Sequence, residues 1–154
     1  MSIHFFLPGK ASKIRLVEFI KKSRVMPFNT TAAAKVILAY QRKEMIKKLV
    51  VLKNMVKSAK KSIVDPNLFI EHLKKIKEEG YSICKEEMEE GVMAVAAPIW
   101  DIKPRVVGSV AVVGPMNRIE NLEQDFVKNI KKTAYLISRE MGYNPEKLKM
   151  YSIF

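Results

Sequence analysis

Hydrophobic residues along this chain fall into two patterns, and each pattern predicts a different kind of element. Residues 92–100 form an unbroken run of nine apolar residues, and residues 106–113 form a second apolar run that ends before Gly114-Pro115. Side chains alternate across a strand, so an unbroken apolar run predicts a strand that is buried on both faces. Shorter strands are expected over residues 3–7, 13–20 and 81–84, the first two forming a hairpin.

In the intervening segments the apolar residues recur at spacings of three and four, which predicts amphipathic helices. Thr30 or Thr31 can cap the first helix, its hydroxyl accepting a free backbone N–H of the first turn. Asp65-Pro66 is a helix start, and Gly80 and Gly142 are expected to end helices in the left-handed conformation. The helices are expected over residues 32–40, 42–59, 66–79 and 122–141.

Short turns join the strands, so most of the pairing is expected to be antiparallel. Together with the helices this predicts an α+β domain, a sheet with helices on more than one side. In the second helix the stripe expected to be buried consists of Met45, Leu49, Leu52, Met55 and Val56.

The two long strands have small residues near the middle of one face. Ala94 and Ala96 share a face of the first strand, and Ser109 and Ala111 share a face of the second. Small side chains on a buried face leave space, and close packing requires that something occupies it. Two occupants are consistent with the pattern: a closely approaching helix, or a small ligand in a preformed pocket.

The net charge of +12 comes from 28 basic and 16 acidic residues, and the basic excess is uneven. Residues 42–61 hold eight basic residues and one acidic residue, Glu44. A basic helix can bind nucleic acid, but this stretch has no interleaved aromatic residue to stack on bases. A lysine-rich solvated face is therefore the preferred interpretation, and nucleic-acid binding remains the alternative.

The residues offer little catalytic chemistry. Cys84, the single cysteine, excludes an internal disulfide and fits a reducing cytoplasm, and it is expected to be a buried apolar residue rather than a nucleophile. His72 lies beside an apolar helical stripe and is expected to be structural, and the glutamates are expected to be solvated. We expect no enzyme, no metal site, no cofactor and no membrane segment or signal peptide.

Several short motifs nevertheless occur in an order typical of one family. The stretch MPFNTTAAAKVILAY is followed by Gly80-Tyr81, the glutamate pair Glu86-Glu87, Gly91, the run VAAPIWD and a strand that ends in Gly114-Pro115. Together they resemble the effector-binding half of the IclR family of transcription regulators. The resemblance covers most of the chain, from about Ile3 to Gly142.

The resemblance implies a GAF-like fold, with a central antiparallel sheet flanked by helices. It further implies binding of a small organic effector, often a carboxylic acid, and assembly into homodimers or homotetramers. In the family DNA is read by a separate N-terminal winged helix. We therefore expect residues 1–142 to be the effector-binding domain, residues 143–154 a tail, and no winged helix in this chain.

Carried over by position, the effector pocket would lie at the start of the first helix and on the small-residue face. The residues implied are Ala32, Ala33, Cys84, Val92, Ala94, Ala111 and Val113, and Ser109 adds the single polar side chain of the two strand interiors. Family members that bind polar acids carry Asp, Ser or Cys at several of these positions, so a more apolar ligand is also consistent with this chain. The alternative is a stand-alone GAF-like sensor that acts through protein partners.

Overall fold

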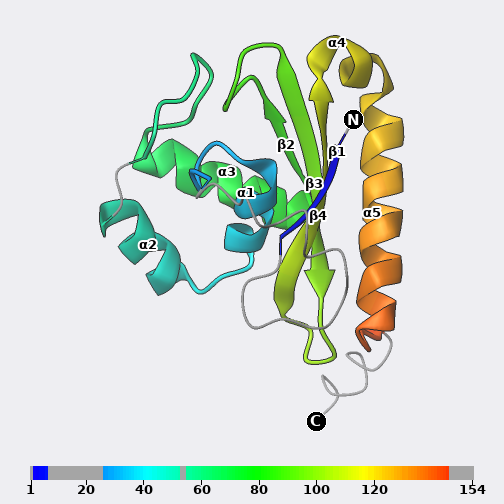
Figure 1. The fold of residues 1–154 in the computed structure, drawn as a ribbon. Coiled ribbons are helices and arrows are strands. Elements are labelled where there is room, and N and C mark those ends of the chain that lie inside the picture. Colours follow the sequence, from blue (N-terminus) through cyan, green and yellow to red (C-terminus); the bar gives the residue numbers. More distant parts are fainter. Residues whose placement is uncertain (1, 7–25, 53–54, 146–154) are drawn as a thin grey trace.

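The computed structural model describes residues 2–6, 26–52 and 55–145, which form four strands and several helices around one sheet (Figure 1). The strands are β1 (Ser2–Phe6), β2 (Ser82–Lys85), β3 (Val92–Trp100) and β4 (Val106–Pro115). The helices are α1 (Ala32–Ala39), α2 (Lys43–Leu52), α3 (Pro66–Glu79), α4 (Met116–Ile119), the 3-10 turn η2 (Glu120–Leu122) and α5 (Glu123–Glu140).

The sheet has the order β1-β4-β3-β2, and every neighbouring pair is antiparallel. The predicted α+β class is therefore confirmed. Strand β1 pairs with β4, whereas the hairpin partner expected over residues 13–20 lies outside the described residues. Strand β4 continues through Gly114-Pro115 instead of ending before them, and α4 follows directly.

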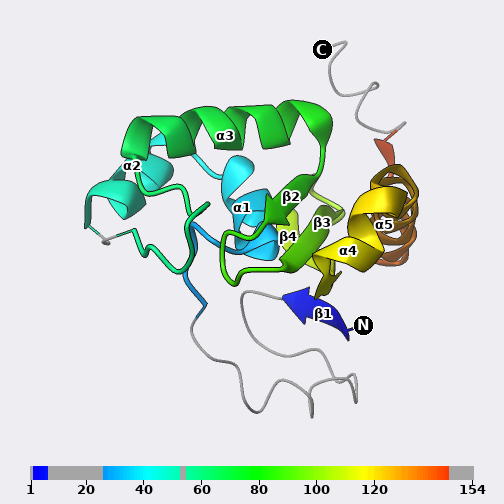
Figure 2. The same cartoon turned by 90° about the horizontal axis from the view of Figure 1, so that it is seen from above.

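Helices cover both faces of the sheet, which explains why β3 and β4 are apolar on both sides (Figure 2). Helix α5 packs on one face, where Met93, Val95, Ile99 and Val110 are buried. Helix α1 packs on the other face and is itself covered by α3. Helix α2 lies beside the N-terminal end of α3, away from the sheet (Figures 1 and 2).

The predicted ends of α3 and α5 are confirmed by backbone geometry. The Asp65 carboxylate accepts hydrogen bonds from the N–H groups of Asn67 and Leu68, at 2.8 and 2.9 Å. Gly80 has a φ of 76° and ends α3, and Gly142 has a φ of 87° just beyond α5. Both are conformations that glycine adopts without steric cost.

The predicted second helix is wrong in length, and its expected stripe is buried only in part. Helix α2 ends at Leu52, and residues 55–58 are not helical. The Asn29 amide bonds to both the N–H and the C=O of Val56, so tertiary hydrogen bonds hold this backbone outside a helix. Leu49 and Met55 of the expected stripe pack half-buried against the core, whereas Met45, Leu52 and Val56 are exposed. The residue that α2 buries fully is Val50.

None of the described helices is long and apolar enough to cross a membrane. Within the same described residues, no three side chains of His, Cys, Asp or Glu gather as metal ligands would.

Candidate functional site

The face of small residues lies under α1. Ala96 and Ala111 are opposite each other in β3 and β4, and both are buried in one cluster with Ala32 and Val36 of the helix. The Ser109 hydroxyl donates to the C=O of Ala33 at 3.2 Å, so the first turn of α1 is held against β4. Small side chains therefore let the helix approach the sheet closely over this part of the face.

The residues implied as pocket lining divide into two groups by exposure. Four of them are buried beneath or beside α1, namely Ala32, Cys84, Ser109 and Ala111. The other four are half-buried, namely Ala33, Val92, Ala94 and Val113. Ala94 and Val113 are direct partners across β3 and β4, and Cys84 is the partner of Ala94 in β2. The structure therefore brings Cys84, Ala94 and Val113 together in one row across three strands.

The N-terminus of α1 is not capped in the way that the sequence predicts. Thr31 occupies the capping position, but its hydroxyl donates to the C=O of Pro27 and does not accept from the helix. No acceptor among the described residues reaches the N–H groups of Ala33 and Ala34. The Thr30 hydroxyl is buried, also without a described partner. Free N–H groups at a helix start favour a negatively charged or carbonyl group.

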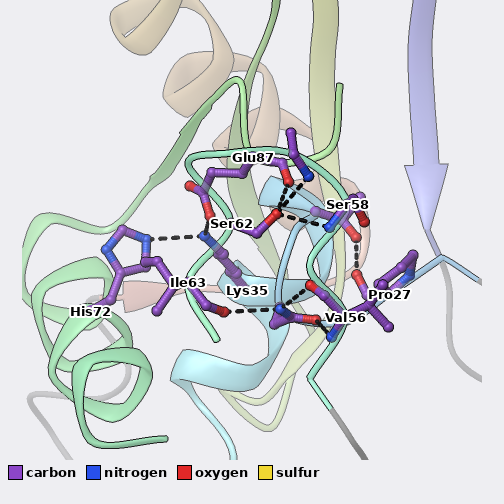
Figure 3. Close-up of polar contacts among 11 residues, drawn as sticks. Pro27, Lys35, Val56, Ser58, Ser62, Ile63, His72 and Glu87 are labelled. Carbon is purple, nitrogen blue, oxygen red and sulfur yellow. Dashed lines mark hydrogen bonds and ion pairs between the residues drawn. The ribbon is translucent and has the colours of Figure 1, made fainter. Parts of the chain in front are cut away.

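A buried ion pair lies one turn further along α1 (Figure 3). The Lys35 side chain is completely buried, and its ammonium group contacts the Glu87 carboxylate, which is also buried. His72 of α3 places Nε2 3.4 Å from Lys35 Nζ. The expectation that the glutamates are solvated is wrong for Glu87, because this carboxylate neutralises a lysine inside the domain.

The pKa values of His72 and Cys84, which lie next to this ion pair, are shifted by burial. Burial lowers the pKa of His72 to about 4, and the positive charges of Lys35 and Lys75 add to the effect. His72 is therefore neutral near pH 7, and its ring nitrogen can accept a hydrogen bond from Lys35. Burial also raises the pKa of the Cys84 thiol to about 12, with Lys35 and Glu87 acting in opposite directions. A thiol of this kind is a poor nucleophile, consistent with the buried, unreactive role expected for Cys84.

Two further buried side chains, Asn29 and Ser62, connect surface segments to this centre. Asn29, just before α1, donates to the C=O groups of Val56 and Ile63, both at 2.9 Å. The Ser62 hydroxyl accepts from the N–H of Ala59 at 2.9 Å and donates to the C=O of Glu87 at 2.6 Å. The loop after α2 and the turn after β2 are thus hydrogen-bonded to each other beside α1.

The sequence analysis missed this polar centre. Lys35 and Glu87 are 52 positions apart, so no local spacing links them. One local signal exists: Lys35 lies three residues after Ala32 and next to Val36, inside the stripe of α1 that is buried. A lysine in a buried stripe requires an acidic partner.

A surface cleft lies on the other side of this centre, along the outer edge of β2. Its volume is about 360 Å³, and Ile83 and Tyr81 line it together with His72, Ile76 and Glu87. His72 and Glu87 therefore separate the buried Lys35 ammonium group from this cleft. The half-buried residues Ala94 and Val113 are not among the residues that line it.

The chain matches known proteins over most of its length. Residues 12–139 match the family described as the C-terminal domain of the bacterial transcriptional regulator IclR. The HTH-type transcriptional regulator KdgR of Escherichia coli K12 is 28% identical over 134 residues, which are 86% of this chain and 51% of that protein. This chain spans about half the length of the curated relatives that it matches.

Solved structures agree with this match. The C-terminal domain of E. coli KdgR superposes with a TM-score of 0.77 at 26% identity, covering 92% of this chain and 87% of that chain. An inducer-binding domain of the transcription factor PobR from Acinetobacter, a double mutant in complex with 3-hydroxybenzoic acid, has a TM-score of 0.73. At 19% identity, over 88% of this chain and 86% of that one, PobR shows the shared fold.

The fold is thus the GAF-like α+β arrangement found in ligand-binding domains of transcription regulators. More narrowly, the chain belongs to the IclR family and corresponds to its C-terminal domain.

Proposed function

We propose that this chain is the effector-binding and oligomerising part of an IclR-type transcription regulator. In this proposal it senses a small organic molecule in the cytoplasm, assembles as a homodimer or homotetramer, and affects DNA only through a separate N-terminal domain. The observation that carries the proposal is the uncapped start of α1 next to a face of small residues, in a chain of this family. No catalytic step is assigned to it.

The proposed ligand site consists of Ala32, Ala33, Cys84, Val92, Ala94, Ser109, Ala111 and Val113. The half-buried residues would contact the ligand directly. The buried residues would lie beneath them and keep α1 and the strands in place. The free N–H groups of Ala33 and Ala34 suit a carboxylate or carbonyl oxygen, and the surrounding alanines and valines suit an apolar body. The expected ligand class is therefore a small organic acid with an apolar portion, such as an aromatic acid.

A thermal-shift screen of small aliphatic and aromatic acids, with 3-hydroxybenzoate among them, tests the proposal. A ligand that binds only the folded chain stabilises it by about 2.7 kcal/mol when its concentration is 100 times its Kd, so a specific acid raises the Tm. The expected shift disappears in Ala94→Leu, because the larger side chain fills the half-buried surface. The matched control is Ala97→Leu, which makes the same change on the α5 face of the same strand.

Circular dichroism first establishes that both variants fold. Loss of the ligand response in Ala94→Leu but not in Ala97→Leu supports the proposed site. A response that survives in folded Ala94→Leu contradicts its position. A screen in which no acid shifts the Tm of the wild-type chain contradicts the expected ligand class.

A further inference from the structure

Helix α2 exposes large apolar side chains to solvent. Val51 is 82% exposed and Leu52 is 69% exposed, and Met45 on the same helix is also exposed. Only Val50 of this helix is fully buried. An exposed group of large apolar residues on a small domain is typical of a surface that another molecule covers. We call Met45, Val51 and Leu52, with the lysines described next, the α2 surface.

The charges around Met45, Val51 and Leu52 indicate which kind of partner can bind there. Lys43, Lys47 and Lys48 are exposed on α2, and none of them forms an ion pair with a described residue. Glu44 is the one acidic residue of the helix. A partner that buries this surface must therefore bring negative charge together with apolar contact.

The same chain carries a surface of that kind, at the corner where η2 and the start of α5 lie beside the end of β2. A hollow of about 460 Å³ lies there, and three acidic residues and one lysine line it: Glu120, Glu123, Asp125 and Lys85. The Lys85 ammonium group pairs with Glu120 and Glu123, at 3.2 and 2.7 Å, so the three carboxylates keep an excess of negative charge that one lysine does not balance. Leu122 lines the same hollow and is 53% exposed. This corner hollow is concave, acidic and partly apolar, whereas α2 is a convex, basic and partly apolar helix.

We infer that the α2 surface of one copy binds in the corner hollow of a second copy of this chain. Helix α2 and helix α4 lie at opposite ends of the domain in both views, so the two surfaces cannot meet within one copy (Figures 1 and 2). In the contact Lys47 and Lys48 face Glu120 and Asp125, and Leu52 packs on Leu122. A head-to-tail contact of this kind forms a ring when the rotation between copies closes and an open filament when it does not, or it forms twice about a two-fold axis. The inference rests on the oligomerisation proposed above and specifies the surfaces that produce it.

Charge-swap complementation tests the contact. Lys47→Glu/Lys48→Glu reverses the α2 surface, and Glu120→Lys/Asp125→Lys reverses the corner hollow. Each variant alone is expected to associate at least about tenfold more weakly than the wild-type chain, in light scattering after gel filtration. Native mass spectrometry of a 1:1 mixture is expected to show a mixed assembly, because each reversed surface meets a complementary one. Raising the salt concentration is expected to weaken the wild-type assembly.

The matched control is Lys103→Glu/Lys132→Glu, which makes the same charge change at exposed positions outside both surfaces and is expected to assemble as the wild type does. A wild-type chain that is monomeric overturns the proposed oligomerisation and this contact with it. A wild-type assembly that both reversed variants retain overturns only the contact, and so does a mixture that fails to assemble. A lysine variant that still assembles but loses affinity for a DNA duplex identifies α2 as a nucleic-acid surface and overturns the inference.

Discussion

The two faces of the sheet bury different kinds of side chain. The α5 face is made of large apolar side chains such as Met93, Val95 and Ile99, and the helix that covers it contributes Ile130 and Ala134. The α1 face has alanines, a serine and a cysteine near its middle, and the helix that covers it carries a buried lysine. One face therefore resembles an ordinary core, and the other combines close packing with buried charge.

The two faces therefore depend on different kinds of contact for their stability. Apolar burial on the α5 face stabilises the fold without any requirement for an exact partner. On the α1 face two buried polar side chains depend on particular partners: Lys35 on Glu87, and Asn29 on the backbone of Val56 and Ile63. Such a face loses stability whenever one partner is removed, and it is also the face that carries the proposed ligand site.

The largest effect is expected from breaking the buried ion pair. Glu87→Ala leaves the Lys35 ammonium group buried without a counter-charge, which destabilises the chain by about 3–5 kcal/mol. Denaturant unfolding followed by circular dichroism measures this loss.

The double variant Lys35→Met/Glu87→Leu is the control for that prediction. It replaces both charges by apolar groups of similar size and is expected to recover most of the lost stability. A double variant as unstable as Glu87→Ala indicates that the pair is required for reasons other than charge balance.

A smaller loss is expected from truncation on the α5 face. Ile99 is 1% exposed, and Ile99→Ala is expected to cost about 2–5 kcal/mol, with the value set by how far the cavity collapses. Ile102→Ala, which truncates a largely exposed isoleucine in the next turn, is the matched control and is expected to change stability by less than about 0.5 kcal/mol. Equal losses for the two variants would contradict the position of the α5 core.

Enlarging residues on the α1 face is expected to have a graded effect. Ala96→Leu inserts a larger side chain where α1 approaches closely, at a cost of about 1–3 kcal/mol. Ala94→Leu, two residues earlier on the same face, is expected to cost less because Ala94 is half-buried. Thermal unfolding of the two variants side by side checks the order, and a larger loss for Ala94→Leu would refute the assignment of the open part of the face.

Sequence pattern predicted the parts of this fold that depend on local order. The apolar runs defined β3 and β4 and their two buried faces, and Asp65 and Gly80 marked the two ends of α3. The pattern failed at the end of α2, because the hydrogen bonds from Asn29 to Val56 join positions 27 residues apart.

Less of the candidate site than of the fold could be predicted from the sequence. Side-chain alternation indicated the small residues of β3 and β4, and family resemblance added the start of α1; the role of these residues in binding stays a prediction. The Lys35–Glu87 pair was missed because the two residues are 52 positions apart, so the position of Lys35 in the α1 stripe gives no indication of its partner. Short motifs identify which segments matter, whereas long-range polar contacts require the three-dimensional structure.

The last prediction concerns the pH dependence of stability. It tests whether His72, beside Lys35 of α1, is shielded from water. His72 has a pKa of about 4 in the folded chain, below the value of about 6.5 expected when the chain is unfolded. Between these values the unfolded chain binds the extra proton, so this group contributes stability that is full above pH 6.5 and is lost as the pH falls towards 4. His72→Gln keeps a hydrogen-bond acceptor for Lys35 but cannot titrate, so its free energy of unfolding should fall less steeply over that range. Denaturant unfolding of both proteins from pH 7.5 to 4 measures the two slopes, and parallel curves would mean that His72 titrates normally and that the α1 face is open to water at this point.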